Sequence, residues 1–389
     1  MAASTGAMNL LTYGYTILAA RVLGPEAFGA FSSVMSVLLV LNVLSLGLQA
    51  AGARRIAADP ARAAEIAPAV LRLARRAALA LGVLCLAAAP LLDRVLRLDH
   101  PAIALLVAAT VVPLTVMGGQ AGVLQGERRW NPLAWLFLAS GAGRVLLGVG
   151  PMLVWRTELA AVLGVALGAW LPVLVGARAL RPVRPSGPGS PREAMAVLRE
   201  VGHSSHALLA FFALSNADMV VARAIFDDRS AGVYAGGVIL VKAIVFLPQF
   251  VIVMAFPSMS SAGATRRALL EALALVVGLG AAAVVGTLVL PDLALAFVGG
   301  AEYAEIRGSL WVFATLGTVL SLVQLLLYAV LARRHRWSVA LVWVTLAALL
   351  VLGPRAEDVE ALVALVTSLD AALVAGLLLV NVSRRPRPA

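Results

Sequence analysis

The sequence predicts an all-α integral membrane protein with about twelve transmembrane helices in two six-helix lobes. Hydrophobic residues make up 61% of the 389-residue chain and charged residues 13%, whereas soluble domains are about half apolar and a quarter charged. Apolar runs of about 20 residues, the length that crosses the hydrocarbon layer, recur from end to end. Similar motifs also recur in the two halves, in the same order.

Twelve apolar runs are candidates for membrane-spanning helices. They lie at 4–20, 28–49, 77–96, 102–124, 131–154, 159–180, 203–225, 232–256, 269–291, 308–331, 338–353 and 359–381. The two longest connections are 50–76 and 181–202, so we expect no soluble domain.

The placement of the arginines predicts the orientation. With the N-terminus in the cytoplasm, the inner loops and tail carry 21 arginines and the outer loops carry eight. This positive-inside pattern predicts a multi-pass protein of the cell membrane with both termini cytoplasmic. It also explains the formal charge of +11 without a nucleic-acid partner.

A segment rich in Pro, Gly and Ser, RPVRPSGPGSPRE at 181–193, separates six runs from six. This composition predicts an irregular linker. We therefore expect an N-terminal lobe at 1–180, a cytoplasmic linker at 181–202, a C-terminal lobe at 203–382 and a cytoplasmic tail at 383–389.

The repeated motifs predict that the lobes are copies of each other. Ala20-Arg21 is matched by Ala222-Arg223, Gly29-Ala30-Phe31 by Gly232-Val233-Tyr234, residues 51–55 by 262–267, and 123–130 by 330–337. Six helices return the chain to its starting side, so both copies have the same orientation. Such parallel repeats predict a substrate site between the lobes and transport by alternating access. The alternative is two unrelated halves with similar loop chemistry.

The run ARVLGPEAFGAFSSVMSVLLVLNVLSLGLQAAGARRIA at 20–57 resembles the opening signature of polysaccharide and oligosaccharide flippases. These belong to the multidrug/oligosaccharidyl-lipid/polysaccharide (MOP) exporter superfamily. NAD at 216–218, AGVYA at 231–235 and FPSMS at 256–260 are similar to the seventh and eighth helices of that family.

The resemblance implies a flippase for a lipid-linked oligosaccharide or polysaccharide precursor, carried on polyprenyl pyrophosphate from the inner to the outer leaflet. The expected partners are this substrate and membrane lipid. A coupling proton or sodium ion and an association with polysaccharide polymerase or glycosyltransferase machinery are left open. No cofactor is implied.

Two cations within the predicted spans are candidate ligands of the pyrophosphate. Arg144 lies about midway along its run, too deep to reach either surface easily, and its planar fork of donors matches phosphate oxygens. Lys242 is the only lysine of the chain. Asp218 reaches a similar depth on the neighbouring run, so static Asp218–Lys242 pairing is the alternative to a substrate or coupling role. A pair that opens when pyrophosphate arrives would combine both.

Three polar residues within the spans are candidate glycan contacts: Gln120, Asn216 and Gln249. Hydrogen bonds between helices explain each of them equally well.

Four further residues are candidates for gating or coupling: Arg21, Arg223, Asp218 and Asp370. Arg21 and Arg223 occupy equivalent outer ends in the two copies, where interfacial arginines are also common. Asp370 lies about mid-span in the last run and would carry a coupling ion. Its alternative is a structural partner of Arg144 or of a nearby hydroxyl group.

Several function classes are excluded or disfavoured. The sole lysine lies in a helix, so a P-loop of the Gly-rich Lys-Ser/Thr type is impossible, and no outer loop is long enough for a glycan polymerase site. We expect neither an enzyme nor a metal site. Two alternatives to a flippase stay open: a cation-coupled multidrug exporter of the same superfamily, and a non-transporting subunit of an envelope-polymer assembly complex. An exporter is disfavoured because every acid of the first half lies in a loop or at a helix end.

Overall fold

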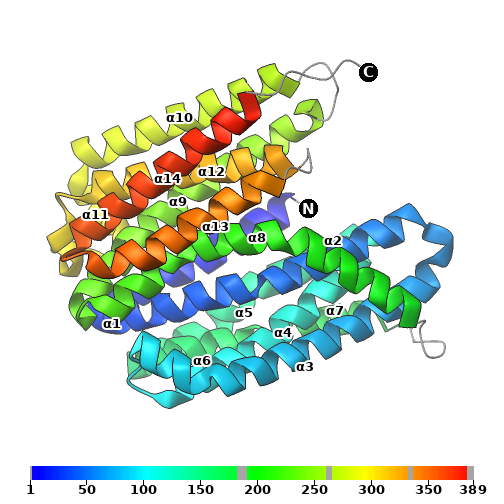
Figure 1. Ribbon diagram of the computed structural model, residues 1–389. Coiled ribbons are helices and arrows are strands. Elements are labelled where there is room, and N and C mark those ends of the chain that lie inside the picture. The colour runs from blue at the N-terminus through cyan, green and yellow to red at the C-terminus, as the bar shows by residue number, and fades with distance from the viewer. Residues whose placement is uncertain (1, 182–190, 260–264, 332–335, 383–389) are drawn as a thin grey trace. The chain divides into compact units, whose positions relative to one another are not determined.

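The computed structural model describes residues 2–181, 191–259, 265–331 and 336–382, which are helical almost throughout and contain no strand (Figure 1). The chain divides into two compact units. Unit 1 comprises Met1–Leu23 and Ala30–Phe212, and unit 2 comprises Gly24–Gly29 and Ala213–Ala389. This division reflects compactness and not sequence symmetry, so the six-plus-six lobe boundaries and the repeat stay predictions.

Unit 1 is built from the first seven helices and the beginning of the eighth. They are α1 (Ala2–Leu41), α2 (Val43–Ala58), the short η1 (Pro60–Arg62), α3 (Ala63–Leu96), α4 (Pro101–Gly126), α5 (Trp130–Trp155), α6 (Glu158–Gly168), α7 (Trp170–Ala179) and α8 (Pro191–Ile225). Helix α4 packs along both α2 and α3, while α5 packs against α6 and α7.

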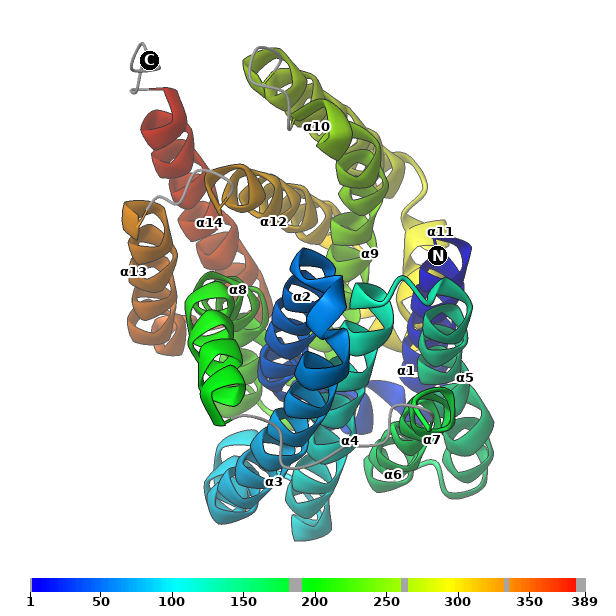
Figure 2. The same cartoon turned by 90° about the vertical axis from the view of Figure 1, so that its right-hand side faces the viewer.

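Unit 2 is built from the end of α8 and the helices that follow. These are α9 (Asp228–Met259), α10 (Thr265–Val289), α11 (Pro291–Val298), η2 (Ala301–Ile306), α12 (Leu310–Leu331), α13 (Arg336–Leu352), η3 (Gly353–Arg355) and α14 (Val359–Val382). Helix α12 is central to this unit, because it packs against α9, α10 and α14 (Figure 2).

Eleven helical stretches within the described residues are long and apolar enough to cross a membrane. The first, Ala3–Ala58, is 56 residues long and contains two of the predicted spans. Between them the helix breaks at Gly24, whose φ of 72° lies in the region that favours glycine. Pro25 follows, where proline fits the first turn of a new helical segment. The predicted fold class, an all-α multi-pass membrane protein, is confirmed.

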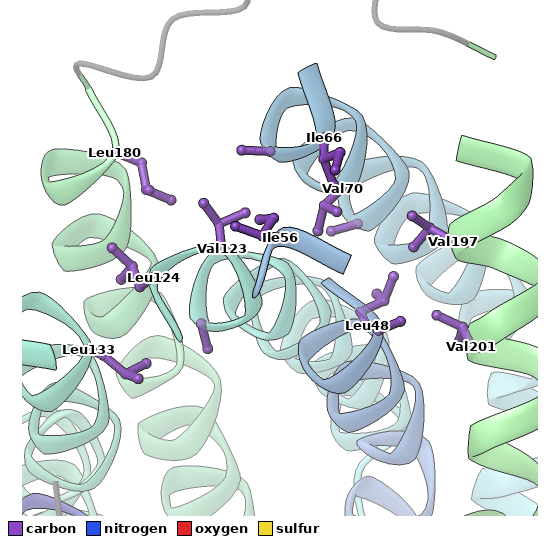
Figure 3. Close-up of a cluster of buried hydrophobic side chains, with 14 of the residues drawn as sticks. Leu48, Ile56, Ile66, Val70, Val123, Leu124, Leu133, Leu180, Val197 and Val201 are labelled. Atoms are coloured by element: carbon purple, nitrogen blue, oxygen red, sulfur yellow. The ribbon is translucent and has the colours of Figure 1, made fainter. Parts of the chain in front are cut away.

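One apolar core cluster of unit 1 joins five helices at one end (Figure 3). It brings together residues of α2, α3, α4 and the start of α8, with Leu133 and Leu180 beside them. Close approach of α4 to α2 depends on glycine, because a Cβ on Gly122 would lie only 2.8 Å from the carbonyl oxygen of Gln49. Ser45 of α2 also donates a hydrogen bond to the carbonyl of Leu114 (2.7 Å).

The beginning of α8 differs from the predicted linker. The helix starts at Pro191, so residues 191–202, expected in the linker, are helical and belong to unit 1. Proline is well suited to a first helical turn. Val197 and Val201, one turn apart, are 0% and 3% exposed in the core, and Glu200 forms an ion pair with Arg54 (3.2 Å). The Pro-, Gly- and Ser-rich composition predicted an irregular segment at 181–193, and the helix includes the last three of these residues.

Unit 2 includes the turn of α1 at Gly24–Gly29. A Cβ on Gly29 would lie 2.9 Å from the Cα of Gly232, so these two backbones touch. The ring of Phe28 meets that of Tyr303 edge-on, with centroids 6.3 Å apart. Gly29 and Gly232 are equivalent positions in the predicted repeat.

Candidate functional site

In unit 1, Arg144 lies near the middle of α5, which packs against α6 and Tyr15 of α1. Close packing of α5 and α6 depends on glycine pairs: a Cβ on Gly164 would overlap the Cα of Gly148, and one on Gly143 would overlap the carbonyl oxygen of Gly168. Small residues at such positions let membrane helices approach backbone to backbone. Arg144 is therefore held on a rigid helix pair.

Tyr15 of α1 contacts both α5 and α6. Its hydroxyl group donates to the carbonyl oxygen of Ala161 in α6 (2.8 Å), and its ring lies against Gly148. Tyr15 is 3% exposed and is close enough to Arg144 for the two groups to interact electrostatically. Sequence reasoning missed this residue, although a tyrosine inside an apolar run signals a hydroxyl group that needs a partner.

Arg144 itself is partly buried. Among the residues that the structure describes, it has no ion-pair or hydrogen-bond partner. The predicted alternative, a pairing of Arg144 with Asp370, would join the two units and stays a prediction. The predicted intramembrane cation is thus present in unit 1 without a carboxylate to neutralise it, and its donors are available to an anion.

In unit 2, Lys242 of α9 is anchored on α8. Its Nζ donates to the carbonyl oxygen of Ser215 (2.6 Å) and to Oδ1 of Asn216 (3.1 Å). The amide group of Asn216 donates in turn to Oγ of Ser215 (3.2 Å). Asn216 therefore binds a neighbouring helix, which is the interhelical alternative to the predicted glycan contact.

Two buried carboxyl groups accompany Lys242. Asp218 of α8 and Asp370 of α14 are 4% and 1% exposed, and both are close enough to interact electrostatically with the ammonium group. Tyr234 of α9 donates to Oδ2 of Asp218 (2.9 Å). Oδ1 of Asp218 and both oxygens of Asp370 have no hydrogen-bond partner in the described residues. No direct Asp218–Lys242 ion pair occurs in that part of the chain.

The remaining predicted residues have different surroundings. Gln120 is 5% exposed and donates to the carbonyl of Val173 in α7 (3.1 Å), so it joins two helices of unit 1. Arg223 is 1% exposed and pairs with Asp228 (2.8 Å), whereas Arg21 is exposed. The side chain of Gln249 lies outside the described residues.

Within the described residues, no group of three or more His, Cys, Asp or Glu side chains is placed to hold a metal ion. Each unit thus has its own candidate residues in the described part of the chain: Arg144 in unit 1, and Lys242 with Asp218 and Asp370 in unit 2.

A family model described as "Polysaccharide biosynthesis protein" matches residues 1–262. No curated protein matches the sequence.

Solved structures share the fold over almost the whole chain. An inward-facing multidrug resistance MATE family transporter of the MOP superfamily has a TM-score of 0.73 at 18% identity, covering 95% of this chain and 93% of that one. Lipid II flippase MurJ in an inward closed conformation has a TM-score of 0.78 at 14% identity, covering 99% and 87%. A MOP superfamily transporter from Pyrococcus furiosus has a TM-score of 0.62 at 15% identity, covering 97% and 92%.

These neighbours are transporters and not enzymes. At such identities they establish the fold alone, which is similar to that of MOP superfamily transporters. The family model, which includes residues 20–57, confirms the resemblance seen there. Because the family model covers about two thirds of the sequence, the chain belongs to the polysaccharide biosynthesis protein family.

Proposed function

We propose that the chain is a flippase that moves a lipid-linked oligosaccharide or polysaccharide precursor from the inner to the outer leaflet. The family membership supports a role in polysaccharide biosynthesis, and the fold is shared with a flippase whose substrate is itself a lipid, lipid II. The proposal includes alternating access of the two predicted lobes and an orientation with both termini cytoplasmic.

The single observation that carries the proposal is Arg144. A charged side chain at membrane depth is costly and is usually paired or functional. Arg144 has no carboxylate partner among the described residues and is held on the glycine-packed pair of α5 and α6. Its guanidinium group offers two parallel donors to a phosphate group. In the proposed function, the pyrophosphate group of the lipid carrier is the anion that binds Arg144.

Lys242 contributes less directly to substrate binding, because two of its three donors are already used by Ser215 and Asn216. The cluster that it forms with Asp218 and Asp370 is the candidate for ion coupling. One ammonium group cannot neutralise two ionised carboxylates, so a proton or another cation completes the charge balance.

A multidrug exporter is the second candidate, favoured by the likeness to MATE transporters and by the carboxyl groups of unit 2. It is disfavoured by unit 1. There, the described acidic residue that is buried, Glu158 at 4% exposure, lies in the first turn of α6. No acid in the described part of unit 1 lies midway along a helix, where a cationic drug would need one.

Depletion of the protein tests the proposal. Lipid-linked glycan should accumulate at the inner leaflet, and its accessibility to an impermeant probe at the outer surface should fall. Unchanged outward exposure would refute the flippase function. Increased retention of cationic drugs in the same cells, with normal glycan exposure, would favour the exporter. A loss of polymer assembly despite normal glycan exposure would favour a non-transporting role beside polymerase or glycosyltransferase machinery.

A further inference from the structure

The oxygen atoms around Lys242 are of the kind that alkali cations prefer. Its ammonium group is bound by the main-chain carbonyl of Ser215 and the amide oxygen of Asn216, with the carboxyl groups of Asp218 and Asp370 within electrostatic range. Carbonyl, amide and carboxylate oxygens are the ligands of hard cations. In transporter folds, such oxygens hold coupling ions near the membrane midplane.

The carboxyl groups of the cluster have unused acceptor capacity. Oδ1 of Asp218 and both oxygens of Asp370 have no hydrogen-bond partner in the described residues. The two side chains are 4% and 1% exposed, so water does not readily replace the missing donors. Without Lys242, this part of unit 2 would be an oxygen-rich, negatively charged site with nothing to balance it.

The ammonium group differs from a dissolved ion because it is attached to α9. A tethered group competes at a high effective concentration and cannot diffuse away. A free ion would have to displace Nζ from Ser215 and Asn216 before it could use their oxygens.

We propose that Lys242 is a built-in replacement for a bound sodium ion, so that the cluster around Lys242 binds no sodium ion in the native chain. Of the coupling ions left open by the sequence, sodium is thereby excluded at this cluster. The consequence for transport rests on the proposed flippase function, but the claim about ion binding does not.

Sodium binding to the purified full-length chain tests the proposal. Thermal unfolding is measured in detergent in sodium chloride and in choline chloride of equal concentration. For the wild type we expect the same midpoint in both salts. Lys242→Met keeps a flexible apolar side chain and removes the charge, so sodium should raise the midpoint of this variant in a saturable way. Lys242→Gln is a second variant with the same expectation.

The double variant Lys242→Met/Asp370→Asn is the matched control, and its midpoint should lose the sodium response. A saturable sodium response in the wild type would overturn the proposal. Folded Lys242→Met and Lys242→Gln without a sodium response would also overturn it. The proposal expects sodium to fill the site that Lys242 vacates. A Lys242 variant that folds only in sodium therefore supports the proposal. Lys242 variants that fold in neither salt count against it. None of these readouts uses the lipid-linked substrate, so failure of the flippase function would be seen separately, in the depletion experiment.

Discussion

Two buried tyrosines show that the charged side chains within the predicted spans have different surroundings in the two units. In unit 1, Tyr15 donates to a main-chain carbonyl and lies beside Arg144, which has no carboxylate partner among the described residues. In unit 2, Tyr234 donates to Asp218, a member of the cluster around Lys242. In the described residues, Arg144 of unit 1 thus has no carboxyl group beside it, whereas Lys242 of unit 2 has two, Asp218 and Asp370.

The predicted repeat sharpens this contrast. The offset between Gly29 and Gly232 aligns Tyr15 with Asp218, and the offset between Arg21 and Arg223 aligns it with Ala217, so the predicted repeat places Tyr15 within one residue of Asp218. The two predicted copies therefore differ in charge near this position, which fits the proposed division between anion binding in unit 1 and charge balance in unit 2.

The largest effect should come from Arg144. Arg144→Ala removes a charge-assisted, bidentate contact worth about 1.5–3 kcal/mol, so outward transport of the lipid-linked glycan should fall by about 10–100-fold. Arg144→Lys should recover only part of it, because lysine lacks the planar fork. The measurement is outer-leaflet exposure of the glycan in cells that carry each variant.

Arg178→Ala is the control for Arg144, since Arg178 is an exposed arginine of α7 in the same unit. Transport should be nearly unchanged in this variant. Equal losses in the two variants would mean that general basicity, and not Arg144, is what transport needs.

Lys242→Met should give the largest loss of stability. Removal of one partner from a buried charge cluster typically costs about 3–5 kcal/mol. In the absence of sodium, the unfolding midpoint should therefore fall, and adding Asp218→Asn should restore part of the loss. If the loss in the double variant equalled the sum of the losses in the two single variants, Asp218 and Lys242 would not be coupled.

Gly164→Ala should loosen the helix pair that holds Arg144. The added methyl group would overlap the Cα of Gly148, and overpacking of this kind costs about 1–3 kcal/mol. Gly150→Ala is the matched control on α5, since nothing lies within 4 Å of its Cβ position. The unfolding midpoint should drop for the first variant and stay level or rise for the second.

The two tyrosine hydroxyl groups provide a direct comparison of the units. Tyr234→Phe should cost about 1–3 kcal/mol, because it leaves a buried carboxyl group with no hydrogen bond. Tyr15→Phe should cost about 0.5–1.5 kcal/mol, because its acceptor is a main-chain carbonyl. Unfolding midpoints measure both, and a larger loss for Tyr15→Phe would reverse the comparison between the units.

The smallest effect concerns Asp227, an exposed residue that caps α9. Hydrogen bonds from the backbone N–H and the hydroxyl group of Ser230 hold the pKa of Asp227 below its usual range. Because the pKa is lowered on folding, the contribution is present above the ordinary aspartate pKa and is lost as the pH falls through the lowered value. Between neutral and acid pH, the unfolding midpoint of Asp227→Ala should therefore fall slightly less than that of the wild type. A pH series of unfolding midpoints measures this difference.

The sequence by itself determined the membrane class, the positions of the spans, the family resemblance and the two intramembrane cations. Length and hydropathy decide whether a helix can cross the bilayer, and both are properties of single segments. The sequence also identified Asp218 and Asp370 as charges at depth, for the same reason.

Only the tertiary structure decided which groups meet. Lys242 donates to Ser215 and Asn216, while Asp218 takes its hydrogen bond from Tyr234. Counting from the turn at 227–230 gives the depth of a side chain but not its rotation about the helix axis. Likewise, the loop-like composition before α8 concealed Val197 and Val201, whose burial depends on partners from α2 and α3. The depth of a side chain in the membrane follows from its own segment, whereas its contacts depend on the neighbouring helices. For that reason, only the tertiary structure distinguished Arg144, which has no carboxyl group beside it in the described residues, from Lys242, which has two.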